Sequence, residues 1–66
     1  MKISKRIKEL RNERGLNQRE LAREIKVSQP TVAAWENGEN EPKAIYIYRL
    51  AEFFDVTADY LLGLED

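Results

Sequence analysis

The sequence predicts an all-α fold: a single domain over residues 1–66, built from five short helices around one core. Glycines and prolines divide the chain into short segments, and apolar residues recur within these segments at helical spacing. No segment alternates apolar and polar residues with the β-branched enrichment typical of a strand. The dividing residues are Gly15, Pro30, Gly38, Pro42 and Gly63.

The first two helices are expected over residues 4–14 and from Asn17 to residue 25. Gly15 separates them, because glycine readily takes the left-handed conformation that ends a helix. Asn17 is a favoured N-cap residue, and Glu20, three positions later, completes a capping-box pattern. The apolar stripe of the first helix consists of Ile3, Ile7 and Leu10. The stripe of the second helix consists of Leu21, Ala22 and Ile25.

A third helix is expected to follow Ser28 as N-cap and to reach residue 37, where Gly38 ends it. Pro30 lies in its first turn, where a helix needs no N–H group. With Val32 and Trp35 turned inward, the opposite face carries Pro30, Ala33, Ala34 and Asn37. This face is short and uncharged, which suits insertion into a DNA groove, although alanine is also simply the best helix former.

A fourth helix is expected from Pro42 to about residue 54, and a short fifth helix between Thr57 and Gly63. The inward set of the fourth helix is Ala44, Ile47, Leu50, Ala51 and Phe54. Further apolar residues remain on this helix outside the stripe, so the C-terminal surface is a candidate for self-association. The predicted dimer patch consists of Tyr60, Leu61, Leu62 and Leu64.

Composition argues against an enzyme, since the chain has no His, no Cys and no glycine-rich phosphate loop. No cofactor is expected, and the acidic residues at 36, 39 and 41 lack the spacing of a calcium loop. The apolar runs are too short to span a membrane and nothing resembles a signal peptide, so a cytoplasmic location is expected.

The net charge of −1 is unevenly distributed along the chain. Residues 1–29 carry nine basic and four acidic residues, a net +5, whereas residues 30–66 carry two basic and eight acidic residues, a net −6. A local positive field is what binding to phosphate requires, although a charged helical surface also serves solubility. Charge alone does not separate these two interpretations.

The predicted helices at 18–25 and 29–37, joined by a three-residue turn, have the spacing of a helix-turn-helix, and Ala22 is small where they must approach. Here the chain resembles the Cro/phage-repressor (XRE-like) family of transcription regulators. The resemblance covers nearly all residues and rests on the strings Gly15-Leu16-Asn17-Gln18, Glu20-Leu21-Ala22, Val27-Ser28-Gln29, Trp35-Glu36-Asn37-Gly38, Glu41-Pro42, Leu50-Ala51 and Asp59-Tyr60-Leu61-Leu62-Gly63.

This resemblance implies a five-helix, lambda-repressor-like DNA-binding domain whose second and third helices form the helix-turn-helix. It implies a sequence-specific regulator, a repressor, that binds an operator-like site on double-stranded DNA as a homodimer, with the third helix in the major groove. Two-fold pairing would place the recognition helices roughly 34 Å apart, one turn of DNA.

The residues expected at the DNA follow from the same resemblance. Positions matching base contacts are Gln29, Pro30, Thr31, Ala33 and Ala34. Positions matching phosphate contacts are Arg11, Asn17, Gln18, Asn37 and Lys43. Arg11 also resembles the partner of Glu36 in an ion pair that braces the first helix against the third. Independently of the family, Gln29 at the exposed end of its helix can pair bidentately with adenine N6 and N7.

The chain departs from the family pattern at three places. Lys26 and Asp55 stand where glycine is common in the family, so each is expected in the left-handed conformation. For Lys26 this conformation is expected to cost about 1 kcal/mol of stability. Glu39 and Glu41 occupy a connector that often carries Lys or Arg toward phosphate. The acidic second half and the uncharged face of the third helix leave a second function class open, an antitoxin-like or adaptor module that binds a protein partner.

Overall fold

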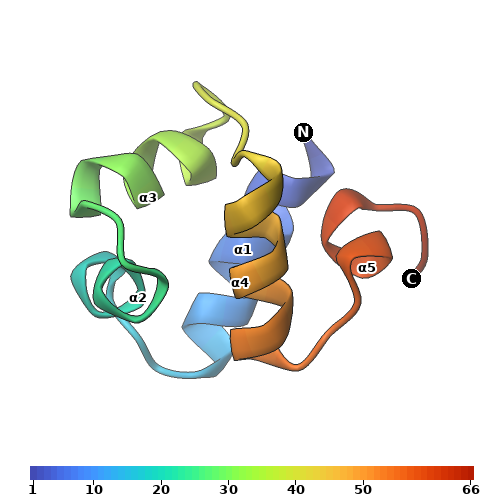
Figure 1. Cartoon of the computed structure of the whole chain (residues 1–66), viewed down its shortest axis with the longest axis horizontal. Helices are drawn as coiled ribbons and strands as arrows, with labels where there is room; N and C mark the ends of the chain where they lie inside the picture. The colour runs from blue at the N-terminus through green and yellow to red at the C-terminus, as the bar shows by residue number, and fades with distance from the viewer.

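Five α-helices and their connections make up the computed structural model, which describes all 66 residues and contains no strand. The helices are α1 (Lys2–Glu13), α2 (Gln18–Ile25), α3 (Gln29–Asn37), α4 (Ala44–Phe54) and α5 (Ala58–Leu62). In Figure 1, α4 crosses in front of α1, with α2 and α3 on the left and α5 on the right. The all-α, five-helix prediction is confirmed. None of these helices is both long enough and apolar enough to pass through a membrane.

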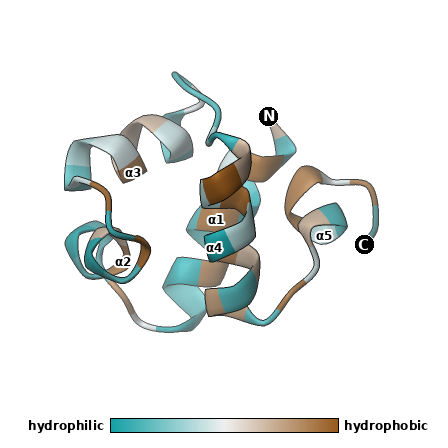
Figure 2. Cartoon of the chain, in the orientation of Figure 1, coloured by the Kyte–Doolittle hydropathy of each residue, from teal (hydrophilic) through white to brown (hydrophobic).

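One hydrophobic core receives side chains from all five helices. α2 packs most extensively against α3, α1 packs against α3 and α5, and α4 packs against α2 and α5. Figure 2 shows hydrophobic residues on α4 and α5 and hydrophilic ones on the connector between α3 and α4. The buried hydrophobic residues are Ile3, Ile7, Leu10, Leu21, Ala22, Ile25, Val32, Trp35, Leu50, Phe54 and Leu61.

Side-chain caps fix where three of the helices begin. The Asn17 Oδ1 accepts from the Glu20 backbone N–H at 2.7 Å, and the Glu20 carboxylate accepts from the Asn17 N–H at 2.9 Å, so the predicted capping box is confirmed. The Ser28 hydroxyl caps α3 at the Thr31 N–H, and the Thr57 hydroxyl caps α5 at the Tyr60 N–H. These local bonds set the element boundaries that the sequence predicted.

The start of α1 differs from the prediction. The helix begins at Lys2 instead of residue 4, and Ser4 lies inside its first turn, where it is buried. Serine favours the N-cap position, but burial of Ile3 in the core extends the helix toward the N-terminus. As a result the Ser4 hydroxyl is buried without a hydrogen-bond partner.

The start of α4 also differs. Pro42 is buried but lies outside the helix, which begins at Ala44 with Lys43 as N-cap. Ala44 was predicted inward and is exposed, although it lies on the same apolar stripe as Ile47. Since α5 has only five residues, it is too short to cover the whole stripe. The uncovered part remains open as a groove, described below.

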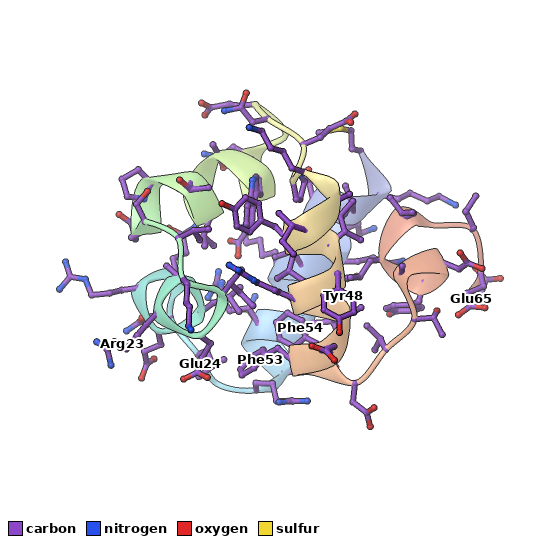
Figure 3. All side chains as sticks on the ribbon, in the orientation of Figure 1. Arg23, Glu24, Tyr48, Phe53, Phe54 and Glu65 are labelled. Atoms are coloured by element: carbon purple, nitrogen blue, oxygen red, sulfur yellow. The ribbon has the colours of Figure 1, made fainter.

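Arg6 is a basic residue of α1 that makes specific contacts with the C-terminal residues. Its Nη1 donates to the backbone oxygens of Tyr60 and Glu65, both at 2.6 Å, and its guanidinium lies 4.1 Å from the centre of the Tyr60 ring. Arg6 therefore ties the C-terminal residues to α1. Figure 3 places Glu65 at the opposite end of the molecule from Arg23 and Glu24 of α2.

The two predicted left-handed residues are confirmed, since Lys26 has φ 67° and Asp55 has φ 56°. Each is the C-cap of its helix, α2 and α4 respectively, and its backbone N–H bonds to a carbonyl of the last turn. The strain at Lys26 is the larger, because Asp tolerates this region better than a long side chain does.

We expect Lys26→Gly to raise the free energy of unfolding by roughly 0.5–1 kcal/mol, because glycine takes a positive φ without strain. Urea denaturation followed by circular dichroism measures the change. The matched control is Lys8→Gly at an exposed position within α1, where the same replacement should lower stability by about 1 kcal/mol. Equal effects at both positions would contradict a strained Lys26.

We expect Ser4→Ala to raise stability by about 1 kcal/mol, because it removes a buried hydroxyl that has no partner. Thermal denaturation of the two proteins measures the difference. Ser28→Ala serves as control, since this serine caps α3 and its loss should lower stability by about 1 kcal/mol. If Ser4→Ala instead lowers stability, the Ser4 hydroxyl must have a hydrogen-bond partner, which would contradict this prediction.

Candidate nucleic-acid interface

The central feature of the interface is the pair α2 and α3, joined by the predicted turn at residues 26–28. The two helices share buried side chains, with Leu21 and Ile25 from α2 and Val32 and Trp35 from α3. The left-handed Lys26 reverses the chain direction after α2, and Ser28 caps the start of α3. The helix-turn-helix predicted from spacing is therefore present.

An ion pair between Arg11 and Glu36 joins α1 to α3. Arg11 Nε donates to Glu36 Oε2 at 2.7 Å and Nη2 donates to Oε1 at 2.9 Å, a two-pronged geometry. The side chains are 11% and 2% exposed, so the pair is largely shielded from water. The hydrogen bond to Glu36 raises the pKa of Arg11 above its ordinary value, against the opposing effect of burial. Arg11 Nη1 also donates to the Leu16 carbonyl at 2.8 Å, which fixes the loop before α2.

Two glutamines extend this ion pair into a network. The Gln18 amide nitrogen donates to Glu36 Oε1 at 3.1 Å, and the Gln29 amide nitrogen donates to Gln18 Oε1 at 2.7 Å. The network thus runs from α1 through the last turn of α3 and the start of α2 to the first residue of α3. Its open end is Gln29, one of the five residues predicted to contact bases.

The predicted base-contacting residues all lie on α3, and none of them is fully buried. Pro30 is exposed, and the other members of the set, Gln29, Thr31, Ala33 and Ala34, are partly exposed. The hydroxyl oxygens of Thr31 and Ser28 lie 2.7 Å apart and form a hydrogen bond. Glu36 is the only charged residue of α3, and Arg11 neutralises it in the interior. The accessible surface of this helix is therefore free of charge.

Two of the predicted phosphate-contacting residues, Arg11 and Gln18, are joined through Glu36, and no hydrogen bond links the other three to them. Asn17 is exposed at the start of α2, and its Oδ1 is used by the cap, so its NH2 group remains available. Lys43 is exposed at the start of α4, and Asn37 makes a long bond of 3.4 Å to Glu39. Arg11 is mostly buried, and after its three hydrogen bonds two of its N–H groups remain unused. Gln18 retains one N–H group in the same way.

The structure corrects the predicted dimer patch at one residue. Leu61 is fully buried in the core of its own chain, so it cannot contribute an exposed contact. Tyr60 is half-buried beneath Arg6, whereas Leu62 and Leu64 are 43% and 74% exposed. Leu61 and Leu62 are adjacent in α5, and only one of them can point into the core. Packing against the other helices places Leu61 inside and leaves Leu62 exposed.

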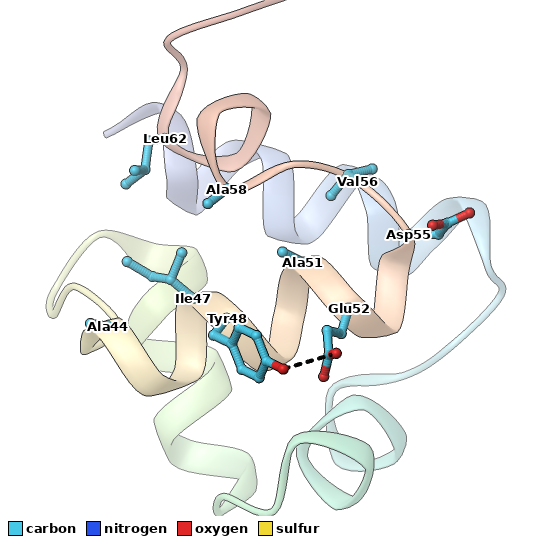
Figure 4. A pocket seen from close by; sticks show the side chains of 9 residues that line it. All are labelled: Ala44, Ile47, Tyr48, Ala51, Glu52, Asp55, Val56, Ala58 and Leu62. Carbon is cyan, nitrogen blue, oxygen red and sulfur yellow. Dashed lines mark hydrogen bonds between the residues drawn. The ribbon is translucent and has the colours of Figure 1, made fainter.

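An apolar groove of about 620 Å³ lies beside this patch, between α4 and α5. Its floor is the part of the α4 stripe that α5 leaves uncovered (Figure 4). Tyr48 and Glu52 border it and share a hydrogen bond of 3.0 Å, which raises the pKa of Tyr48 above its ordinary value. The apolar lining residues are Ala44, Ile47, Tyr48, Ala51, Val56, Ala58 and Leu62.

We expect Arg11→Met to lower the free energy of unfolding by about 3 kcal/mol, because it leaves the Glu36 carboxylate buried without its counter-ion. The double variant Arg11→Met/Glu36→Leu should recover most of this loss, since an apolar pair needs no charge compensation. Urea denaturation of the single and double variants measures both. A loss below about 0.5 kcal/mol in Arg11→Met would place the pair among weak surface ion pairs.

A family model described as helix-turn-helix matches residues 7–61. The chain is 32% identical over its full length to the HTH-type transcriptional activator BcrR of Enterococcus faecalis, and covers 32% of that protein. It is 43% identical over 54 residues, 82% of its length, to the cryptic phage CTXphi transcriptional repressor RstR of Vibrio cholerae, of which it covers 49%. The chain spans about half or less of the length of these relatives.

Two solved structures share the fold closely. One is the P22 c2 repressor in complex with synthetic operator 9T, with a TM-score of 0.87, 26% identity and 92% of each chain covered. The other is the solution structure of the DNA-binding domain of the same repressor, with a TM-score of 0.86, 27% identity, and 94% of this chain and 82% of that one covered. Together with the family match, they establish that the chain belongs to the helix-turn-helix family of DNA-binding transcription regulators of the Cro and phage-repressor type, which is not a family of enzymes.

Proposed function

We propose that this protein is a sequence-specific DNA-binding transcription regulator, a repressor, that inserts α3 into the major groove of an operator-like site. The observation that carries the proposal is the network ending on Gln29, which holds a side-chain amide at the partly exposed start of a helix whose accessible surface carries no charge. The P22 c2 repressor, which shares this fold, is described in complex with a synthetic operator. The sequence predicts a cytoplasmic location for the protein, and a regulator of this kind acts in the compartment that contains its DNA.

Small and uncharged side chains on α3 favour close approach to the base pairs. Ala33 and Ala34 present only methyl groups, which suit contact with the thymine methyl, and no charge on this face has to be removed from water. Gln29 is the one long polar side chain of α3 in the predicted base-contacting set. We therefore assign base selection mainly to Gln29, with a smaller part for Thr31.

The proposed phosphate contacts surround α3. Asn17 and Gln18 at the start of α2 each retain amide N–H groups, and Lys43 supplies a positive charge at the start of α4. Asn37 lies at the end of α3, beside the acidic connector. Because Glu39 and Glu41 repel phosphate, we expect the basic first half of the chain to supply most of the electrostatic attraction.

We further propose that the protein binds its operator as a homodimer through the C-terminal surface. Leu62 and Leu64 are exposed, Tyr60 lies next to them, and the α4–α5 groove offers apolar surface continuous with Leu62. Exposed apolar surface of this extent on a small domain favours association. Two-fold pairing would present two α3 helices to successive turns of the major groove.

A protein-interaction module is the second candidate function, and the same groove is the observation that favours it. An antitoxin-like or adaptor protein would use the apolar groove and the acidic second half to bind a partner protein. Binding to random DNA that disappears at moderate salt, with no selected sequence, would favour this second function over the first.

The function is tested by selecting bound sequences from random double-stranded DNA and measuring affinities by fluorescence anisotropy. We expect Gln29→Ala to lose about 1–3 kcal/mol of binding free energy at one base pair of the selected site. Lys43→Ala is the control, because loss of a phosphate contact should weaken all sequences alike and reduce the salt slope by about 1. Uniform weakening by Gln29→Ala, or a slope near zero for the unaltered protein, contradicts the proposal.

Self-association is tested by sedimentation equilibrium with and without operator DNA. We expect Leu62→Gln/Leu64→Gln to weaken the dimer, because the substitutions place polar amides in an apolar contact. Ile45→Gln is the matched control, since Ile45 is exposed to a similar extent but does not line the groove. A dimer that tolerates the leucine changes and is lost with Ile45→Gln would place the interface elsewhere.

A further inference from the structure

The hydrogen bonds that end on Gln29 have a fixed direction, and Glu36 determines it. A carboxylate has no proton to donate, so both of its oxygens act only as acceptors. Glu36 Oε1 lies 2.9 Å from Arg11 Nη2 and 3.1 Å from a terminal atom of the Gln18 amide, which must therefore be the nitrogen. Arg11 can only donate and Glu36 can only accept, and Glu36 is the one of these two that contacts an amide and so determines its orientation.

The orientation of Gln18 fixes that of Gln29. With its nitrogen turned to Glu36, Gln18 presents its carbonyl oxygen to Gln29, and the Gln29 amide must offer its nitrogen at 2.7 Å. Residues 29 and 36 are two helical turns apart on α3, about 10 Å of rise, so they cannot meet directly. Gln18 from α2 bridges this distance and transmits the orientation.

The groups that remain free on Gln29 are one N–H and the carbonyl oxygen. Adenine offers N7 as acceptor and its N6 amino group as donor in the major groove, which matches this pair. Guanine offers two acceptors, N7 and O6, and would need both N–H groups of the amide. One of these is already donated to Gln18, and the Gln29 oxygen would face guanine O6 across the gap.

We propose that Glu36 is a specificity-determining positioning residue: through Gln18 it fixes the Gln29 amide so that the domain accepts adenine and rejects guanine at one base pair. This inference rests on the proposed function and adds to it the residue that holds the Gln29 amide in the orientation suited to adenine. Glu36 touches no base itself. Its effect on the DNA passes entirely through two amide side chains.

Glu36→Gln tests the inference, because it keeps the shape of the side chain and removes the acceptor-only character. The matched control is Arg11→Lys, which removes the two-pronged geometry of the ion pair but keeps a positive charge beside Glu36, so that an ionised carboxylate still faces Gln18. Affinities of the full chain are measured for its selected site and for the same site with guanine in place of adenine opposite Gln29. The ratio of the two affinities is insensitive to a partly unfolded population, which lowers both equally.

We expect the unaltered protein and Arg11→Lys to prefer adenine by roughly 10- to 100-fold, the range of a good bidentate contact. In Glu36→Gln the preference should fall at least tenfold, because the Gln18 and Gln29 amides can then rotate together. An adenine preference that survives in Glu36→Gln, or that falls equally in both variants, overturns the inference and leaves DNA binding in place. Absence of any sequence-selective binding by the unaltered protein overturns the proposed function itself.

Replacement of the target adenine by 7-deazaadenine or by purine, which lacks the N6 amino group, supplies a second measurement. Each analogue removes one of the two bonds that the fixed amide makes. Both should weaken binding by the unaltered protein, and both should matter less to Glu36→Gln. Equal losses in the two proteins would show that Gln29 is oriented by the DNA and not by Glu36.

Discussion

The ion pair between Arg11 and Glu36 is the interaction on which the arrangement of the binding surface depends. It joins α1 to α3, and the third bond of Arg11 holds the loop that leads into α2. Replacing such a pair by apolar residues often costs a protein nothing, so its value here lies less in net stability than in geometry. A carboxylate in this position gives the neighbouring amides a direction that an apolar contact could not supply.

Charge is divided between the two halves of the chain in a way that suits this geometry. The first half is basic and includes α1 and α2, while the acidic residues gather in the connector after α3 and toward the C-terminus. The proposed attraction to phosphate is therefore local and directional despite a net charge of −1. The accessible surface of α3 adds no charge of its own, which is consistent with the proposed selection of a base through hydrogen bonds from Gln29.

The apolar residues of α4 are less fully covered near the C-terminus of the chain than the rest of the core is. α5 is short, and it leaves part of the apolar stripe of α4 uncovered, which produces the groove beside Leu62. Arg6 compensates on the other side by holding the chain end to α1 through two backbone oxygens. The surface proposed for the dimer is thus a consequence of the short length of α5. The apolar residues of α4 that α5 leaves uncovered are available for contact with a second chain.

Periodicity and capping chemistry in the sequence determined the number of helices and the turn between α2 and α3. They also determined the core position of Trp35 and the left-handed conformation of Lys26 and Asp55. All of these features depend on neighbours within a few residues along the chain. The start of α1, the exposure of Ala44 and the burial of Leu61 depended on which elements cover which stripe, and only tertiary packing settles that. The same limit applies to the site. The sequence identified Gln18, Gln29 and the Arg11–Glu36 pair separately, but their connection requires the start of α2 to lie between two turns of α3, a proximity that no local pattern encodes.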